Sequence, residues 1–227
     1  MTEKHNLKIK KVKKGFPLGR AIAILRREMP RYAVPIVSHY VESPFRVLIS
    51  TLLSLRTKDK TTAAAAQRLF AQADTPEAIL RIPLESLEKI IYPVGFYKNK
   101  AATLHHVCRT LLETYGGKVP SDLDELLTIK GIGRKTANLV VTLGFNLPGI
   151  CVDIHVHRIS NRWGYVKTAV PDETETALRK KLPKKYWIEY NDLLVTYGQN
   201  VCLPVSPHCS KCPLAAFCPK VGVTRHR

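Results

Sequence analysis

The sequence has 227 residues, of which 45% are hydrophobic and 24% are charged. These values are typical of a globular protein and exclude collagen, wholesale disorder and a disulfide-dense miniprotein. The 36 Lys and Arg residues outnumber the 18 Asp and Glu residues, so the net charge is +18. Such an excess favours a polyanionic partner, either nucleic acid or an anionic membrane surface, and its plainer alternative is an aid to solubility.

The sequence predicts no membrane-spanning helix. A span needs roughly 18 consecutive apolar residues, and the longest apolar stretch, residues 139–152, is interrupted by Thr142, Asn146 and Pro148. Residues 1–14 form a basic arm with six Lys and one Glu, unlike a secretion signal or a mitochondrial presequence. We therefore expect a monomer with no membrane partner, working in a prokaryotic cytoplasm at the nucleoid.

Apolar residues follow helical spacing of three and four almost throughout, as in residues 45–53 and 104–112. Strand-like alternation is nearly absent, so an all-α protein of about ten helices is expected. A helix must stop at residues 146–149, which contain Pro148 and Gly149. Three pairs are typical of helix starts: Thr75 with Pro76, Ser121 with Asp124, and Asp172 with Glu175.

Residues 123–144 read as two helices joined by a glycine-containing turn at residues 129–133. Gly131 and Gly133 suit a turn that needs positive φ and close approach of another backbone, and Ile132 can plug the gap between the helices. The free amides that open the second helix form a site for a phosphate oxygen. This pattern predicts a helix-hairpin-helix that contacts the DNA backbone without sequence preference, against the alternative of an ordinary glycine turn.

Lys135 falls in the first turn of the second helix. The positive end of the helix dipole and the neighbouring Lys130 and Arg134 favour its neutral amine, which is a nucleophile. The alternative is that Lys135 only touches phosphate. Asp153 follows 18 residues later and is expected to begin a helix. It either caps that helix or, facing Lys135, instead activates the amine or stabilises positive charge on a sugar.

Four of the six cysteines lie within 17 residues. Cys202, Cys209, Cys212 and Cys218 follow the spacing C-x6-C-x2-C-x5-C. Four thiolates can close a tetrahedral site for Zn²⁺ or hold an iron–sulfur cluster, and the spacing alone does not choose. Cys108 and Cys151 stand in apolar stretches, where each is expected to act as a small buried hydrophobe.

The hairpin at residues 126–137 (LLTIKGIGRKTA), the segment 152–155 (VDIH) and the four-cysteine tail together resemble the endonuclease III family of base-excision DNA glycosylases. The resemblance covers residues 43–218. It implies a helix-hairpin-helix glycosylase fold in which residues 37–147 form a six-helix barrel domain. Residues 1–36, the basic arm and first helix, would join residues 148–227 in a helical [4Fe–4S] cluster domain, with DNA in the cleft between the two domains.

The resemblance also implies the activity, that of a bifunctional DNA glycosylase and AP lyase of base excision repair. Such an enzyme removes oxidised pyrimidines from double-stranded DNA and nicks the abasic strand by β-elimination, without a divalent metal. By the same resemblance Lys135 is the nucleophile that forms a Schiff base and Asp153 is the essential acid. The four cysteines would hold the [4Fe–4S] cluster, which is then favoured over zinc.

The residues expected to bind DNA are Arg56, Phe96, Lys130, Gly131, Gly133 and Arg134. Arg56 and Phe96 match two family loops that fill the stack after a base has been rotated out. Arg56 stands where the family has Gln, and Phe96 stands where it often has Leu. Ile154 likewise replaces the usual Thr after the essential Asp. These departures leave the preference for the lesion and for the opposite base open.

Two other functions are compatible with parts of the sequence. One is a monofunctional glycosylase of the same superfamily that removes adenine or mismatched thymine without lyase activity. The other is a non-enzymatic helix-hairpin-helix DNA-binding protein in which the metal serves structure alone. By the resemblance, relatives of the adenine type lack Lys at the position of Lys135, which argues against the first function. The pairing of Asp153 with Lys135 argues against the second.

Overall fold

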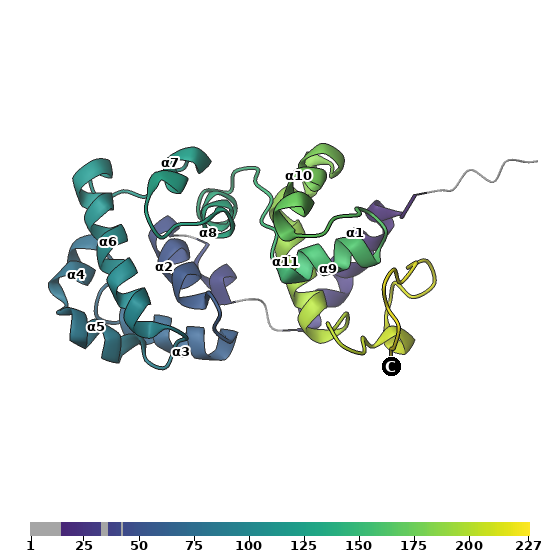
Figure 1. The fold of residues 1–227 in the computed structure, drawn as a ribbon, viewed down its shortest axis with the longest axis horizontal. Coiled ribbons are helices and arrows are strands. Elements are labelled where there is room, and N and C mark those ends of the chain that lie inside the picture. Colours follow the sequence, from purple (N-terminus) through teal and green to yellow (C-terminus); the bar gives the residue numbers. More distant parts are fainter. Residues whose placement is uncertain (1–14, 33–35, 42) are drawn as a thin grey trace, which may run out of the picture.

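The computed structural model describes residues 15–32, 36–41 and 43–227, and the basic arm at residues 1–14 lies outside this range. Within it the chain is helical and contains no strand, which confirms the all-α prediction (Figure 1). The helices are α1 (Leu18–Glu28), α2 (Pro44–Ser54), α3 (Asp59–Phe70), α4 (Pro76–Arg81), α5 (Leu84–Ile91), α6 (Tyr97–Tyr115), α7 (Leu123–Thr128), α8 (Arg134–Leu139), α9 (Ile154–Arg162), α10 (Pro171–Lys181) and α11 (Trp187–Asn200).

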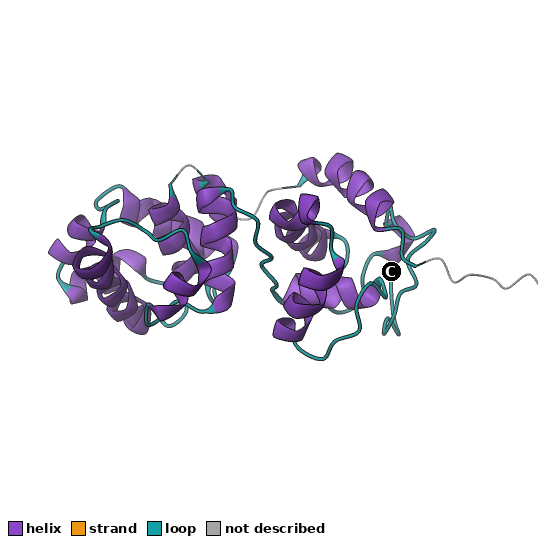
Figure 2. Cartoon of the chain, turned by 90° about the horizontal axis from the view of Figure 1, so that it is seen from above, coloured by secondary structure: helices purple, strands orange, loops and turns teal. Residues whose placement is uncertain are grey.

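The helices form two lobes, each around its own hydrophobic core. Helices α2 to α8 make one lobe, whose core includes Leu48, Leu104 and Leu126. Helix α1 precedes α2 to α8 in the sequence, but it packs with α9, α10 and α11 in the second lobe, around Trp163 and Tyr190. Figure 2 shows the two bodies side by side with the chain crossing between them. The domain bounds at residues 36/37 and 147/148 stay a prediction.

Helix starts were predicted in part. The Thr75 side chain accepts a hydrogen bond from Ala78 N and caps α4, as expected. The prediction of Ser121 as the next cap is wrong, because Asp122 accepts from two backbone amides there. The prediction of Asp172 is also wrong, since α10 begins one residue earlier at Pro171. A carboxylate satisfies two free amides at once and proline needs no amide partner, so both residues are better helix starts.

The hairpin is built by α7, a tight turn and α8. Gly131 has φ +100°, and a Cβ there would lie 2.6 Å from Thr103 Cγ2, so only glycine fits. Gly133 has ordinary φ −93° and open space around it, so the expectation of a strained backbone holds for the first glycine alone. Ile132 is buried between the helices as expected. Helix α8 continues into a π-helical turn, η3 (Val140–Gly144), which ends before residues 146–149.

Both isolated cysteines are buried in apolar surroundings. Cys108 and Cys151 are 0% and 1% exposed, as expected for small hydrophobes. Burial raises the pKa of the Cys108 thiol to about 12, so it stays protonated at neutral pH. Among the described residues no helix is both long and apolar enough to cross a membrane.

Candidate active site

A pocket of about 830 Å³ is lined by residues of both lobes. Its walls come from the ends of α2 and η2 (Ile36–Tyr40), from α8 and η3, and from α9 and α11. The lining residues are Val37, Ser38, Ser54, Arg56, Thr57, Asp59, Lys135, Leu139, Leu143, Asp153, Ile154, His155, Asn191, Asp192, Val195 and Gln199. The pocket therefore exists only because the chain folds α9 and α11 against the hairpin lobe.

Lys135 and Asp153 meet in this pocket. Lys135 lies in the first turn of α8 and its Nζ is 3.8 Å from Asp153 Oδ2. The Asp153 side chain is 8% exposed, whereas that of Lys135 is 41% exposed, so the amine projects into the open part of the pocket. The other carboxylate oxygen, Oδ1, accepts hydrogen bonds from His155 N and Val156 N and caps α9. Asp153 thus caps α9 through one oxygen and faces the amine through the other, and its part in activating Lys135 stays a prediction.

Other polar side chains also line the pocket, among them Ser38, His155 and Asp192. Ser38 donates a hydrogen bond to Asp192 Oδ2 at 2.9 Å, and burial raises the pKa of Asp192 above its usual range despite that bond. Burial also lowers the pKa of His155, and this outweighs the charge of nearby Asp153, which would raise that pKa. Sequence reasoning missed Ser38 and Asp192, which are 154 residues apart, whereas His155 lies in the segment 152–155 that carries the resemblance.

Arg56 and Phe96 lie next to each other at the pocket's edge. The Arg56 guanidinium carbon is 5.7 Å from the centre of the Phe96 ring, and the ring is 61% exposed. Both residues have positive φ, 52° and 58° respectively. A large exposed aromatic side chain on a strained backbone is costly to a protein in isolation. The two loops that the sequence singled out separately therefore form one exposed feature.

The hairpin residues take different positions. Lys130, Gly131 and Gly133 are exposed along the turn. The Arg134 guanidinium instead donates to Glu175 of α10 at 2.9 Å, and Glu175 also accepts from Arg179. Burial alone would raise the pKa of Glu175, but the hydrogen bonds from both arginines outweigh it and hold that pKa below its usual value. Arg134 thus ties the hairpin to the second lobe, with part of its side chain still exposed.

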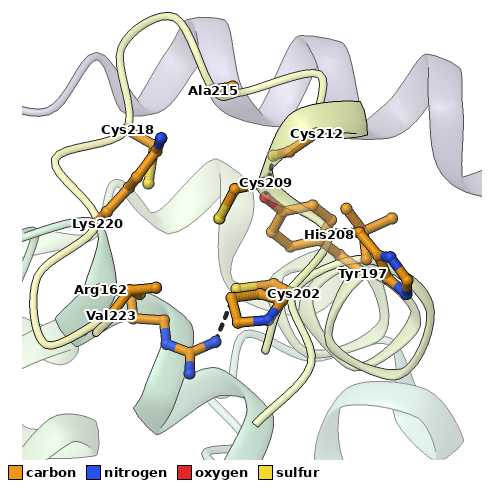
Figure 3. Close-up of a pocket in the computed structure, with 12 residues that line it drawn as sticks. Arg162, Tyr197, Cys202, His208, Cys209, Cys212, Ala215, Cys218, Lys220 and Val223 are labelled. Atoms are coloured by element: carbon orange, nitrogen blue, oxygen red, sulfur yellow. Dashed lines mark hydrogen bonds between the residues drawn. The ribbon is translucent and has the colours of Figure 1, made fainter. Parts of the chain in front are cut away.

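The four C-terminal cysteines line one cavity. It has an empty volume of about 350 Å³, and Figure 3 shows the four side chains arranged around a common space. Arg162 Nη1 donates to Cys202 Sγ at 3.3 Å, and the Tyr197 hydroxyl lies 2.8 Å from Cys212 Sγ. Donors that point at ligand sulfurs are usual around thiolate-bound metal groups.

This arrangement fits a cluster held by four thiolates. The donor set contains four sulfurs and no carboxylate, with one arginine to balance thiolate charge. The sulfurs surround the cavity without closing on one point: among the described residues, no group of three or more His, Cys, Asp or Glu side chains is placed to hold a single metal ion. His208 lines the same cavity.

Comparisons with known proteins agree with the fold. Residues 49–184 match the family model described as "HhH-GPD superfamily base excision DNA repair protein". Endonuclease III of Thermotoga maritima is 46% identical over 181 residues, covering 80% of this chain and 85% of the relative. The chloroplastic endonuclease III homologue 2 of Arabidopsis thaliana is also 46% identical, over 78% of this chain and 48% of its own length. A trapped endonuclease III–DNA covalent intermediate has a TM-score of 0.81 at 34% identity, over 89% of this chain and 94% of that one.

A two-lobed helical fold with a hairpin and a lysine–aspartate pocket defines a helix-hairpin-helix base excision DNA repair protein. Such proteins bind DNA, and solved complexes with DNA share this fold. Within that superfamily the chain belongs to the endonuclease III family, and it is a DNA glycosylase and AP lyase of that type.

Proposed function

We propose that the protein removes oxidised pyrimidines from double-stranded DNA and then cleaves the abasic strand through a Schiff base on Lys135. The observation that carries this proposal is the 3.8 Å approach of Lys135 Nζ to Asp153 Oδ2 inside a pocket about 830 Å³ in volume. A base in a duplex is out of reach of a side chain, so the nucleotide must rotate out of the stack before it meets this pair.

The chemistry follows from an amine next to a carboxylate. Neutral Lys135 Nζ attacks the sugar C1′, and the C1′–N bond breaks with its electron pair leaving on the base, which takes up a proton. Asp153 stabilises the positive charge that develops on the sugar and accepts the proton that the attacking amine releases. The C1′–O4′ bond then breaks, O4′ takes up the proton that Asp153 had accepted, and C1′ stays joined to Lys135 Nζ as an iminium ion, the Schiff base. Loss of a C2′ proton then expels the 3′ phosphate, and water releases the enzyme.

We assign DNA contact to two surfaces beside the pocket. Arg56 and Phe96 would fill the gap that the rotated nucleotide leaves. Lys130, Gly131, Gly133 and the exposed part of Arg134 would hold the DNA backbone, with the amides at the start of α8 facing a phosphate. The exposure of Phe96 and the open space at Gly133 support this assignment.

We further propose that Cys202, Cys209, Cys212 and Cys218 hold a [4Fe–4S] cluster. When bound, the cluster would fix the C-terminal loops against α11 and supply no atom to the steps above. Iron and zinc counts with a visible spectrum test the assignment. Near four irons per chain and a yellow-brown colour are expected, whereas a colourless protein with one zinc would overturn it.

The decisive test of function is borohydride trapping. A covalent protein–DNA adduct is expected on abasic duplex and on thymine-glycol duplex, and Lys135→Ala should abolish both. A monofunctional glycosylase would release base without any adduct, and a non-enzymatic binding protein would retain the DNA unchanged. Either result, or an adduct that survives Lys135→Ala, would overturn the proposal.

The setting of the reaction is also proposed. The bacterial relative at 46% identity supports a prokaryotic cytoplasm, with the protein acting on nucleoid DNA as a monomer. The equally similar Arabidopsis relative is named as chloroplastic, so cell fractionation of the source organism is the direct test. Gel filtration with light scattering should give a mass near the 25.5 kDa of one chain.

A further inference from the structure

A buried lysine outside the catalytic pocket holds the loop that carries Arg56. Lys100, in the first turn of α6, is 8% exposed. Its Nζ donates to Leu53 O at 2.7 Å, to Leu55 O at 2.6 Å and to Thr57 Oγ1 at 2.9 Å. An ammonium has three N–H groups, so all of its donors are used. Leu53 lies in the last turn of α2, where carbonyls lack a helical partner and a cation is favourable.

The same contacts reach the loop that carries Phe96. The Thr57 hydroxyl that accepts from Lys100 also accepts from Gly95 N at 3.0 Å. The two backbones touch here, because a Cβ at Gly95 would lie 2.7 Å from Arg56 O. One ammonium, one hydroxyl and one glycine therefore join two loops that are far apart in the sequence.

Burying the Lys100 ammonium carries a desolvation cost, which indicates that this side chain does more than fill space. Burial lowers the pKa of Lys100 from its usual 10.5 to about 8. None of the ion pairs among the described residues involves Lys100, whose three acceptors are all uncharged. An apolar side chain would avoid the desolvation cost but would leave buried carbonyl oxygens without donors.

The loops need this restraint because of what they display. Arg56 and Phe96 each adopt a left-handed backbone conformation, which is unfavourable for a residue with a side chain and persists only where the surroundings enforce it. The Lys100 ammonium bonds to residues on either side of Arg56, and through Thr57 it is linked to Gly95, next to Phe96. With it, the guanidinium and the ring stay 5.7 Å apart at the pocket's edge.

We propose that Lys100 is a positioning residue whose ammonium holds Arg56 and Phe96 together as one preformed wedge for duplex DNA. This rests on the proposed function, in which these two side chains fill the vacated stack. The ammonium would act on duplex engagement and not on the Schiff base chemistry, since Lys100 does not line the catalytic pocket. Single-stranded abasic DNA has no stack to fill and would not need the wedge.

The test is Lys100→Met, assayed with two substrates. On abasic duplex, KM should rise about tenfold, the effect of roughly 1.4 kcal/mol of lost preorganisation, with kcat unchanged at saturation. Borohydride trapping on a single-stranded abasic oligonucleotide should match the wild type. The control is Lys89→Met, which removes the same charge from an exposed position in α5 and should keep duplex KM unchanged.

A double-mutant cycle separates positioning from a general structural effect. In an Arg56→Ala/Phe96→Ala background, Lys100→Met should add no further loss of duplex affinity, because there is no wedge left to hold. Thr57→Val removes the hydroxyl that links the loops and should raise duplex KM in the same direction, which keeps the proposal testable if Lys100→Met does not fold.

The outcomes distinguish this inference from the proposed function. A wild-type protein that forms no adduct on either substrate overturns the proposed function. A wild-type adduct combined with unchanged duplex KM in a folded Lys100→Met or Thr57→Val variant overturns the wedge alone. The same holds if Lys100→Met weakens single-stranded trapping as much as duplex trapping, or if its duplex loss persists in full in the Arg56→Ala/Phe96→Ala background.

Discussion

The two oxygens of the Asp153 carboxylate make different contacts, so the stability of the protein and its activity can be tested separately at this residue. Oδ1 accepts from two backbone amides at the start of α9, and Oδ2 faces Lys135 Nζ. A capping oxygen needs only to accept a hydrogen bond, whereas support of a cationic sugar needs negative charge. An amide can replace the first function but not the second.

Asp153→Asn should therefore remain stable and lose activity. We expect the free energy of unfolding to change by less than about 0.5 kcal/mol, because the amide oxygen keeps the cap. Base release should slow by about 100-fold or more with the loss of the charge. Asp153→Ala should be equally inactive and lose about 1 kcal/mol of stability. Denaturant unfolding and single-turnover excision measure the two effects, and an active Asn variant would contradict a role for the charge.

Lys100 gives a pH dependence whose sign is set by its lowered pKa. Below about pH 8 the amine is charged in both the folded and unfolded states, and above 10.5 it is neutral in both. Between these values the unfolded chain binds more protons, so the contribution of Lys100 to the free energy of unfolding rises with pH. At about 1.4 kcal/mol per pH unit, the full change is about 3 kcal/mol.

The measurement compares wild type with Lys100→Met by denaturant unfolding from pH 7 to 10.5. The wild type should gain stability relative to the variant as pH rises through 8. Other titrating groups cancel because the two proteins differ only at Lys100. A difference that stays constant over this range would show that Lys100 titrates in the folded protein as it does in the unfolded chain.

At the scale of elements, the hairpin offers a matched pair of glycines. Gly131→Ala places a Cβ 2.6 Å from Thr103 Cγ2 at φ +100°, so both packing and backbone are strained. Gly133→Ala meets nothing within 4 Å at φ −93°. We expect the first variant to lose about 1–3 kcal/mol of stability and the second to unfold as the wild type does.

For DNA binding, in contrast to stability, an effect is expected from the substitution at Gly133. If a phosphate approaches the amides at the start of α8, a methyl group at Gly133 occupies the space it needs. Gly133→Ala should then bind duplex about tenfold more weakly, which is about 1.4 kcal/mol, with no loss of stability. Fluorescence anisotropy on an abasic duplex tests this, and unchanged affinity would mean that the phosphate lies elsewhere.

The elements also show how far sequence reasoning reaches. Thr75, Ile132 and Gly131 were predicted correctly, because capping and tight turns depend on residues within a few positions. Ser121 lost to Asp122 in a competition between adjacent residues that propensity does not resolve. The contact of Arg56 with Phe96 and that of Ser38 with Asp192 depend on how whole helices pack, and no local pattern encodes such pairs. Lys135 and Asp153 were singled out by their places at two expected helix starts, and the family resemblance then implied their roles.

At the scale of the molecule, the pocket is a product of two lobes. Lys135 comes from the hairpin lobe, and Asp153 begins the first helix of the other. Glu175 of α10 holds Arg134 of α8, so the lobes are tied beside the pair that must stay aligned. The chain as a whole has a net charge of +18, which attracts a polyanion without choosing its sequence.

This charge predicts a steep dependence of duplex affinity on salt. Each phosphate neutralised by Lys or Arg releases counterions, so the logarithm of affinity falls with the logarithm of salt concentration at about −0.9 per contact. Six to ten contacts in the cleft would cost about 10³–10⁵ in affinity between 50 and 200 mM salt. Lys130→Ala should reduce the slope by about one, since Lys130 is exposed beside the hairpin turn. Anisotropy titrations at several salt concentrations give the slope directly. A flat profile would contradict the assignment of DNA to the cleft. A steep profile unchanged by Lys130→Ala would contradict only the assignment of phosphates to the hairpin, and the assignment of the lysine–aspartate pocket would stand.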